Sequence, residues 1–217
     1  MSVEGKLNLL NGQSMYGHYK KTNFLKQERM IPFNEAMCTG RTSSDLFSDE
    51  FIAIRAKAHQ VTAEQYNEIT LKPLHPLLTN DFTHIALWFD ADMFCQINLL
   101  TILAWLDQSN HTNLIEIHIV DEEFVPVESF KLQAKGYYAL YKQVLIAKTM
   151  PTSISLAPLK KGVELYFYYL NKDSELMMYI EKYKDTPETE LLSKLLKNFT
   201  EYGLGDTQYM QLIKNSR

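Results

Sequence analysis

One stretch of this chain, residues 83–106, constrains its fold more than any other. It reads THIALWFDADMFCQINLLTILAWL, an apolar segment that stops at two aspartates and then resumes with helical spacing. The continuous apolar run at residues 85–89 is typical of a strand covered on both faces, as in a parallel sheet. After Asp92, apolar residues recur at intervals of three and four, as on one face of a helix. The stretch therefore predicts a buried strand, a turn that carries Asp90 and Asp92, and a buried helix.

The segments around this stretch complete an α/β pattern. Further strands are predicted from short apolar or alternating runs at residues 6–10, 30–35 and 114–120, with one more short strand at residues 129–132. Helices are predicted to begin near Ser14, Ser48 and Thr62, and the last of these is expected to end before Pro73 and Pro76. Helices that alternate with strands indicate a three-layer α/β fold with a mostly parallel sheet of about four to five strands.

Beyond residue 134 the pattern becomes helical throughout. Helical spacing with a start or stop signal occurs at residues 136–149, 157–170, 174–184, 187–202 and 206–215. We therefore expect an α/β domain over residues 1–134 and an all-helical C-terminal domain over residues 135–217. A dense group of tyrosines in the second part, among them Tyr141 and Tyr166, is expected to pack in the core and between the two domains.

The composition narrows the classes of function. Of the 217 residues 46% are hydrophobic, which is enough to bury a substantial core. The net charge of −4 argues against a general attraction to nucleic acid or to anionic lipid. No segment reaches the roughly 18 consecutive apolar residues of a membrane helix. The first residues form no apolar signal segment, and the two cysteines lie in different motifs, so we expect a cytoplasmic protein with reduced thiols and no membrane association.

Polar residues stand where three of the predicted strands end. Asn11, Glu35 and Asp90 occupy these positions. Because the carboxyl ends of parallel strands share one edge of a sheet, where ligands bind in open α/β folds, we expect these residues to converge. Asp92 and Gln96, which lies one helical turn later on the same face, would join them there.

The acids Glu35, Asp90 and Asp92 are the candidate catalytic residues. Such a cluster can hold a hard cation, or can place an acid of raised pKa beside an ionised base. Structural alternatives exist for each: Asp92 as a helix N-cap, Asp90 bound to a loop amide, and Glu35 paired with Arg41 or Arg55. The histidines show no metal-ligand spacing, so no metal ion is predicted, and the sequence specifies neither a cofactor nor an oligomeric state.

The candidate ligand-binding residues are Asn11, Gly12, Ser14, Arg41, Arg55 and Gln96. The Asn-Gly-Gln-Ser segment at a helix start can present backbone N–H groups to an anion. A turn at Gly12 with Ser14 as the helix cap explains the same residues. The arginines suit a phosphate or carboxylate group, but solvated arginines and structural ion pairs are the alternative. The spacings of the glycine-rich phosphate-binding motifs are absent.

Three motifs follow one another in the first half of the chain. They are Leu9-Leu-Asn-Gly-Gln-Ser14, Pro32-Phe-Asn-Glu-Ala-Met-Cys38 with Gly40, and Leu87-Trp-Phe-Asp-Ala-Asp-Met-Phe-Cys-Gln-Ile-Asn-Leu99. In this order they resemble the bacterial family catalogued as "domain of unknown function 1835", over about the first 120 residues. Tyr202-Gly-Leu-Gly-Asp-Thr-Gln208 is similar to the end of the helical region that commonly follows that domain. The resemblance implies an α/β domain with a helical partner and no established activity, and Gln13 departs from it where an acid is expected.

These observations predict that the α/β domain binds a small polar or anionic ligand, with nucleotides among the candidates, at the carboxyl edge of the sheet. An enzyme of this kind would be a hydrolase or transferase with a carboxylate as general base, because the edge offers acids and no activated thiol or histidine. The alternative is a non-catalytic regulatory or interaction protein whose C-terminal helices contact a partner or DNA. The last two helices have a helix-turn-helix outline, but Glu188 and Glu190 argue against DNA.

Overall fold

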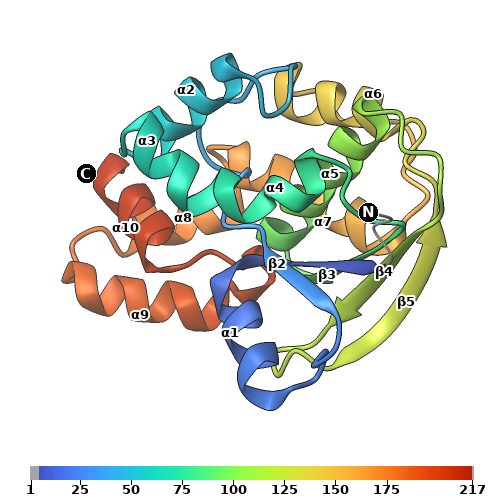
Figure 1. Cartoon of the computed structure of the whole chain (residues 1–217). Helices are drawn as coiled ribbons and strands as arrows, with labels where there is room; N and C mark the ends of the chain where they lie inside the picture. The colour runs from blue at the N-terminus through green and yellow to red at the C-terminus, as the bar shows by residue number, and fades with distance from the viewer. Residues whose placement is uncertain (1–4, 217) are drawn as a thin grey trace.

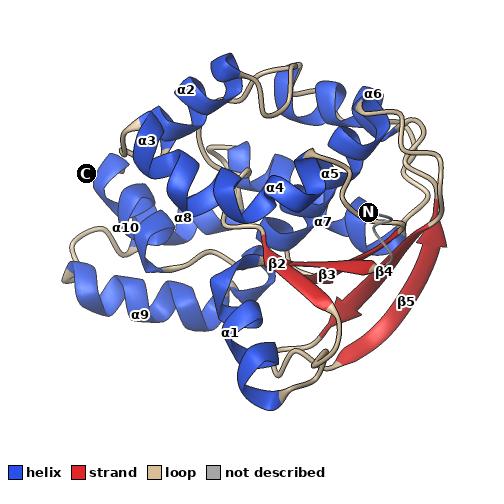
Figure 2. Cartoon of the chain, in the orientation of Figure 1, coloured by secondary structure: helices blue, strands red, loops and turns tan. Residues whose placement is uncertain are grey.

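The computed structural model, which describes residues 5–216, contains a five-stranded sheet that lies at the lower right of Figure 1 and Figure 2, with most of the helices above and to the left of it. The strand order is β2-β1-β3-β4-β5. Neighbouring strands are parallel except for β5, which runs antiparallel to β4 at one edge. This confirms the predicted α/β fold with a mostly parallel sheet. The strands are β1 Lys6–Leu10, β2 Arg29–Pro32, β3 His84–Asp90, β4 Ile115–Val120 and β5 Pro126–Leu132.

Apolar side chains on both faces of the sheet pack against helices, because successive strand residues point to opposite sides, and α1 is the helix on one of these faces. On one face Leu10 and Trp88 pack with Met15 of helix α1, Gly12–Thr22. On the other face Leu9 and Leu87 belong to the main core, together with helices α4, Lys72–Leu78, and α5, Met93–Gln108. The sheet is therefore the middle layer of three, as the sequence predicts.

The direction of the chain along the sheet reverses between β1 and β3. After β1 the chain passes through α1 to β2 on one side, whereas after β3 it passes through α5 to β4 on the other. Such a reversal is the topological switch point of an open α/β sheet, and ligands bind preferentially beside it. Asn11 and Asp90, at the ends of these two strands, border this point.

The connection between β2 and β3 differs from the prediction in one respect. Helix α2, Asp49–Ala58, is followed by α3, Ala63–Tyr66, which begins with the capping box predicted at Thr62. The helix was expected to end before the prolines, but a π-helical turn, Asn67–Leu71, leads directly into α4, which contains both. Pro73 is tolerated because it lies in the first turn of α4, where a backbone N–H has no partner to lose.

The C-terminal helices pack on the far side of α5. Every residue from Cys95 to Leu106 is buried, since α5 contacts β3 on one side and α6 and α7 on the other. One continuous apolar cluster joins the sheet to these helices, and the domain boundary at residue 134 stays a prediction. Within residues 5–216 no helix has the length and apolar character needed to cross a membrane. The remaining helices are α6 Tyr137–Tyr141 with a π-helical turn Lys142–Ile146, α7 Ala157–Leu170, α8 Glu175–Lys182, α9 Glu188–Asn198, a 3-10 turn Thr200–Tyr202, and α10 Asp206–Asn215.

Candidate functional site

The first side of the candidate site is the turn between β1 and α1. The backbone N–H of Asn11 donates to the carbonyl of Trp88 at 3.0 Å, which holds the end of β1 against β3. Helix α1 begins at Gly12, so Asn11 and not Ser14 occupies the N-cap position. Ser14 lies exposed in the first turn, which corrects the alternative interpretation that it caps the helix. The side chain of Asn11 makes no capping bond and is free to bind elsewhere.

Asn11 bridges to α5 through two polar side chains. Its Nδ2 donates to Cys95 Sγ at 2.7 Å, and its Oδ1 accepts from Asn98 Nδ2 at 3.0 Å. Asn98 is fully buried, donates to the carbonyl of Glu35 at 2.7 Å and accepts from the N–H of Met37 at 3.0 Å. One asparagine of α5 therefore fixes the ends of β1 and of the segment after β2 at the same edge of the sheet.

The second side of the site is the turn between β3 and α5. Asp92 is the N-cap of α5, and its Oδ1 accepts from the N–H of Cys95 at 2.7 Å. The side chain of Gln96 donates to the carbonyl of Asp90 at 2.7 Å, and the thiol of Cys95 donates to Asp90 Oδ2 at 3.4 Å. The predicted strand, acidic turn and helix are confirmed, and the capping role considered for Asp92 is present as well.

The surroundings of the two aspartates disfavour their charged forms. Burial raises the pKa of Asp90 to about 6, and the nearby charge of Asp92 adds to this, whereas the hydrogen bond from Cys95 opposes it. Burial also raises the pKa of Asp92, against the effect of the N–H of Cys95. Within residues 5–216 neither aspartate forms an ion pair. Asp90 is thus a carboxyl group that titrates close to neutral pH.

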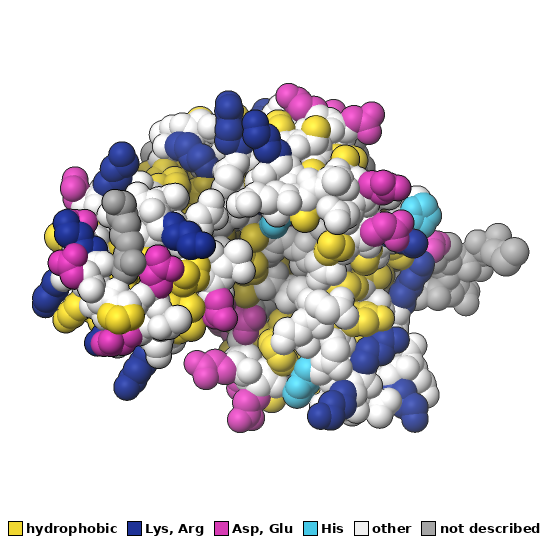
Figure 3. Space-filling model, turned by 90° about the vertical axis from the view of Figure 1, so that its left-hand side faces the viewer, with side chains coloured by type: hydrophobic (Ala, Val, Ile, Leu, Met, Phe, Trp, Pro, Cys, Tyr) yellow, Lys and Arg dark blue, Asp and Glu magenta, His cyan; other side chains and the backbone are white. Residues whose placement is uncertain are grey.

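A cavity of about 290 Å³ opens in front of these aspartates, beside the switch point and toward β4. It joins the ends of β3 and β4 to residues of the C-terminal helices. Five acidic side chains and a single lysine line it, so its local charge is strongly negative. Figure 3 looks onto this side of the molecule, where Asp and Glu side chains gather around a hollow. The lining residues are Asp90, Ala91, Asp92, Val120, Asp121, Glu122, Lys161, Thr200 and Glu201.

The segment before α10 closes over Asp92. Gly203 has a φ of +63°, a backbone conformation that side chains other than glycine rarely adopt. A Cβ atom at this position would lie 2.2 Å from the carboxylate of Asp92, so only glycine fits. Thr200 and Glu201, just before it, line the cavity. The C-terminal part therefore forms one wall of the site.

A cation could be held by the aspartate pair. Side-chain oxygens of Asp90 and Asp92 and the sulfur of Cys95 all lie within 4.8 Å of one another. Two carboxylate oxygens suit a hard cation such as Mg²⁺, whereas a thiol does not. Burial raises the pKa of Cys95 well above its ordinary value, so the thiol stays protonated and serves as a hydrogen-bond donor to Asp90.

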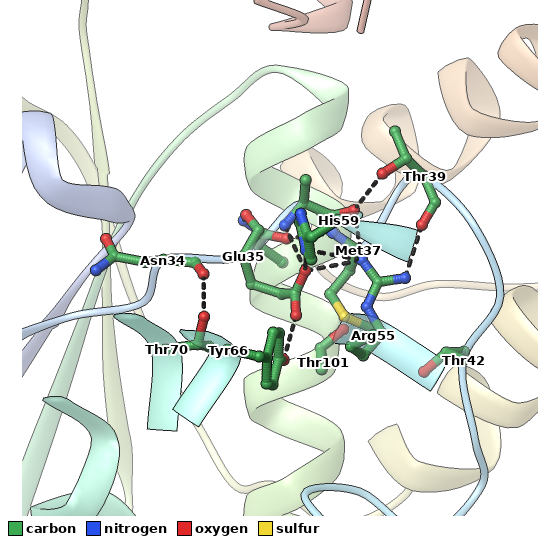
Figure 4. A network of polar contacts seen from close by, with 12 residues as sticks. Asn34, Glu35, Met37, Thr39, Thr42, Arg55, His59, Tyr66, Thr70 and Thr101 are labelled. Carbon is green, nitrogen blue, oxygen red and sulfur yellow. Dashed lines mark hydrogen bonds and ion pairs between the residues drawn. The ribbon is translucent and has the colours of Figure 1, made fainter. Parts of the chain in front are cut away.

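The carboxylate of Glu35 does not line this cavity and belongs to a separate network of polar contacts, which Figure 4 shows. It is fully buried, and Oε1 accepts from the Arg55 guanidinium at 2.7 Å and from the N–H of Ala36 at 2.8 Å. His59 Nε2 also contacts Oε1, and the hydroxyl of Tyr66 donates to Oε2. Burial opposes ionisation, but the hydrogen bond from His59 and the charge of Arg55 outweigh it and lower the pKa of Glu35 to about 2.

Arg55 is also a structural residue. It is fully buried and donates to the carbonyls of Thr39 at 2.7 Å and Arg41 at 2.9 Å, which shapes the loop after β2. The side chain of Arg41 is exposed. Neither arginine lines the cavity, so the ion pair between Glu35 and Arg55 corresponds to the structural alternative.

The structure thus separates the predicted site residues into two groups. Asp90 and Asp92 line the cavity, and Asn11, Gly12 and Gln96 lie beside them at the switch point without lining it, whereas Ser14, Arg41, Arg55 and the carboxylate of Glu35 lie elsewhere. Residues that sequence reasoning missed include Cys95 and Asn98, which connect the first group, and His59 and Tyr66, which complete the network of Glu35. Two sequence features could have indicated these residues. Asn98 lies within the motif at residues 87–99, and His59 follows Arg55 by one helical turn.

No family model, curated protein or solved structure matches this chain. The resemblance to the family "domain of unknown function 1835" stays a prediction, and the site is defined by its geometry alone.

Proposed function

We propose that this chain binds a small polar ligand in the cavity at the ends of β3 and β4, and that Asp90 transfers a proton to or from it. One observation carries the proposal: Asp90 lines an open cavity beside the switch point, its pKa is raised to about 6, and it forms no ion pair within residues 5–216. Structural carboxylates are normally paired or fully hydrogen-bonded, as Glu35 is in this molecule.

The charge of the lining restricts the ligand. Five acidic residues and one lysine, Lys161, line the cavity, so an anion without a bound cation would be repelled. A neutral or cationic polar group can bind directly, and a nucleotide would bind as its complex with Mg²⁺. In that complex Asp90 and Asp92 would hold the cation, since hard cations prefer carboxylate oxygens.

The proposed chemistry follows from the pKa of Asp90. General base catalysis is most effective when the pKa of the base lies near the working pH, and a value of about 6 satisfies this condition. With a ligand that brings no cation, Asp90 is mostly ionised at neutral pH and accepts a proton from a water molecule or from a hydroxyl group of the ligand. The protonated thiol of Cys95 is a poor nucleophile, which favours direct hydrolysis or transfer over a thioester intermediate.

The test combines native mass spectrometry with thermal unfolding. Purified protein is examined for a retained ligand and then heated with ATP plus Mg²⁺, with ATP alone, and with spermidine. A ligand at 100 times its Kd stabilises a protein by about 2.7 kcal/mol, and for this chain length that raises Tm by about 5–10 °C. We expect at least one probe to do so in the wild type.

Two variants localise the binding. Asp90→Asn should lose the shift, and Asp173→Asn, which changes an exposed aspartate outside the cavity, should keep it. An undiminished shift in Asp90→Asn would place the ligand elsewhere. The absence of both a retained ligand and any response to the probes would also contradict the proposal.

A further inference from the structure

A second unusual group, Lys148, lies outside the cavity of Asp90, where the π-helical turn after α6 ends. Its φ is +51°, in the left-handed region where helices most often end with glycine. The turn is closed by the N–H of Ala147, which donates to the carbonyl of Lys142 at 2.8 Å, and by that of Thr149, which donates to Gln143 at 3.0 Å. The backbone therefore holds a lysine in a conformation that is unfavourable for it.

The amino group of Lys148 contacts a buried tyrosine. Although the residue as a whole is exposed, its Nζ donates to the hydroxyl of Tyr166, a fully buried residue of α7, and lies 4.8 Å from the centre of that ring. Within residues 5–216 Lys148 forms no ion pair. Its aliphatic side chain is therefore accessible to solvent, whereas its amino group has no carboxylate partner.

The neighbouring groups favour the neutral amine. Burial lowers the pKa of Lys148 to about 8, and the positive charge of Arg55 adds to this, against a smaller opposite effect of Cys38. The hydroxyl of Tyr166 accepts a hydrogen bond from the ammonium and can equally donate one to the neutral amine. Deprotonation therefore leaves the hydrogen bond intact.

The location also fits a binding site. Lys148 contacts Tyr166 of α7, and the charge of Arg55, which belongs to α2, is close enough to affect the pKa of Lys148, so the amine lies near the junction of the C-terminal helices with the α/β part. Tyr141 of α6 joins the two parts at the same junction, since its hydroxyl donates to the carbonyl of Ser43 at 2.9 Å. Junctions of this kind are common places for small-molecule sites.

We propose that Lys148 is a reactive amine that forms an imine with a small aldehyde or ketone. The lone pair of Nζ attacks the carbonyl carbon and a C–N bond forms, while the carbonyl oxygen takes up a proton and becomes the hydroxyl of a carbinolamine. That hydroxyl then leaves as water, and the nitrogen completes the C=N bond. Both hydrogens of the amine end in the water, so the step needs no oxidant or reductant. Burial raises the pKa of Tyr166, so its hydroxyl orients the amine through their hydrogen bond, and solvent water relays the protons.

The experiment uses the full chain and a matched lysine within it. The protein is treated with limiting acetaldehyde and sodium cyanoborohydride at pH 7.5, and the modified lysines are quantified by peptide mass spectrometry over time. Lys142 is the control, because it also lies over a tyrosine ring, at 4.4 Å from the centre of Tyr138, but that tyrosine is only partly buried, whereas Tyr166 is fully buried. An amine of pKa about 8 is roughly a quarter neutral at this pH, against about a thousandth for an ordinary lysine.

Because lower basicity reduces intrinsic nucleophilicity, we expect modification of Lys148 to be about tenfold faster than that of Lys142, not several hundredfold. The rate at Lys148 should reach half its maximum near pH 8. Tyr166→Phe should slow it severalfold and leave Lys142 unchanged, and circular dichroism checks that the variant is folded. Equal rates at the two lysines, or a rate at Lys148 that still rises above pH 10, would overturn the proposal.

Discussion

Replacing Asp90 by Asn should make the protein more stable at neutral pH while it abolishes ligand binding. Asn has the same shape as Asp, and its amide oxygen can still accept the hydrogen bond from the thiol of Cys95. What the substitution removes is a partly buried charge without an ion-pair partner. The native carboxylate therefore reduces stability, as expected for a group retained for function.

The size of the effect follows from the pKa of Asp90, which is raised from 3.8 to about 6. Each pKa unit corresponds to about 1.4 kcal/mol, so the ceiling is about 3 kcal/mol. Asp90 is partly exposed and solvent screens its charge, so we expect a gain of about 1–2 kcal/mol in the free energy of unfolding. Because the folded pKa is raised, the wild type recovers this stability as the pH falls from about 6 to about 4.

Urea unfolding at pH 7.5 and at pH 4, followed by circular dichroism, measures both parts of the prediction. The difference between Asp90→Asn and wild type should be present at pH 7.5 and nearly absent at pH 4, where both side chains are neutral in the folded state. A variant that is less stable at pH 7.5, or a gain that is the same at both pH values, would refute the assignment of Asp90 as a strained, ionised carboxylate.

Two further predictions concern the structural residues. Glu35→Gln should reduce stability by about 3–5 kcal/mol in urea unfolding at pH 7.5, because it leaves the buried guanidinium of Arg55 without its counter-charge. Since the pKa of Glu35 is lowered from 4.5 to about 2, that difference should shrink as the pH falls through this window, and a loss below about 1 kcal/mol would contradict the ion pair. Gly203→Ala should cost about 1–3 kcal/mol, because its φ is +63° and the new Cβ would meet Asp92. The control Gly17→Ala, inside α1 with open space around it, should instead add about 0.5–1 kcal/mol, and a similar thermal unfolding shift for both would contradict the close packing at Gly203.

The parts of the fold that could be predicted are those in which one local signal dominates. The apolar run before Asp90 and the N-cap signal at Asp92 define β3 and the start of α5 within a residue. The prediction that the helix ends before Pro73 and Pro76 was wrong. Pro73 is compatible with the first turn of α4, which follows the π-helical turn directly, and Pro76 lies inside that helix.

The site was predictable only where the strand itself orients the side chain. Asp90 is the last residue of β3, so its place at the sheet edge follows from the strand. Glu35 lies three residues beyond the end of β2 at Pro32. The alternation of side chains along a strand therefore does not determine which way the Glu35 side chain points. Its orientation is set by Arg55, Tyr66 and His59, which are 20 to 31 residues away in sequence, and no periodic pattern encodes such contacts.

Helix α5 lacks the polar, solvent-exposed face that most surface helices have. Every residue from Cys95 to Leu106 is covered, by the sheet on one side and by the C-terminal helices on the other. Cutting the chain near residue 134 would remove α6 and α7 from this helix and expose the side of it that they cover. An isolated N-terminal fragment should therefore aggregate when expressed, and any recombined version of it must bring its own helices to shield α5.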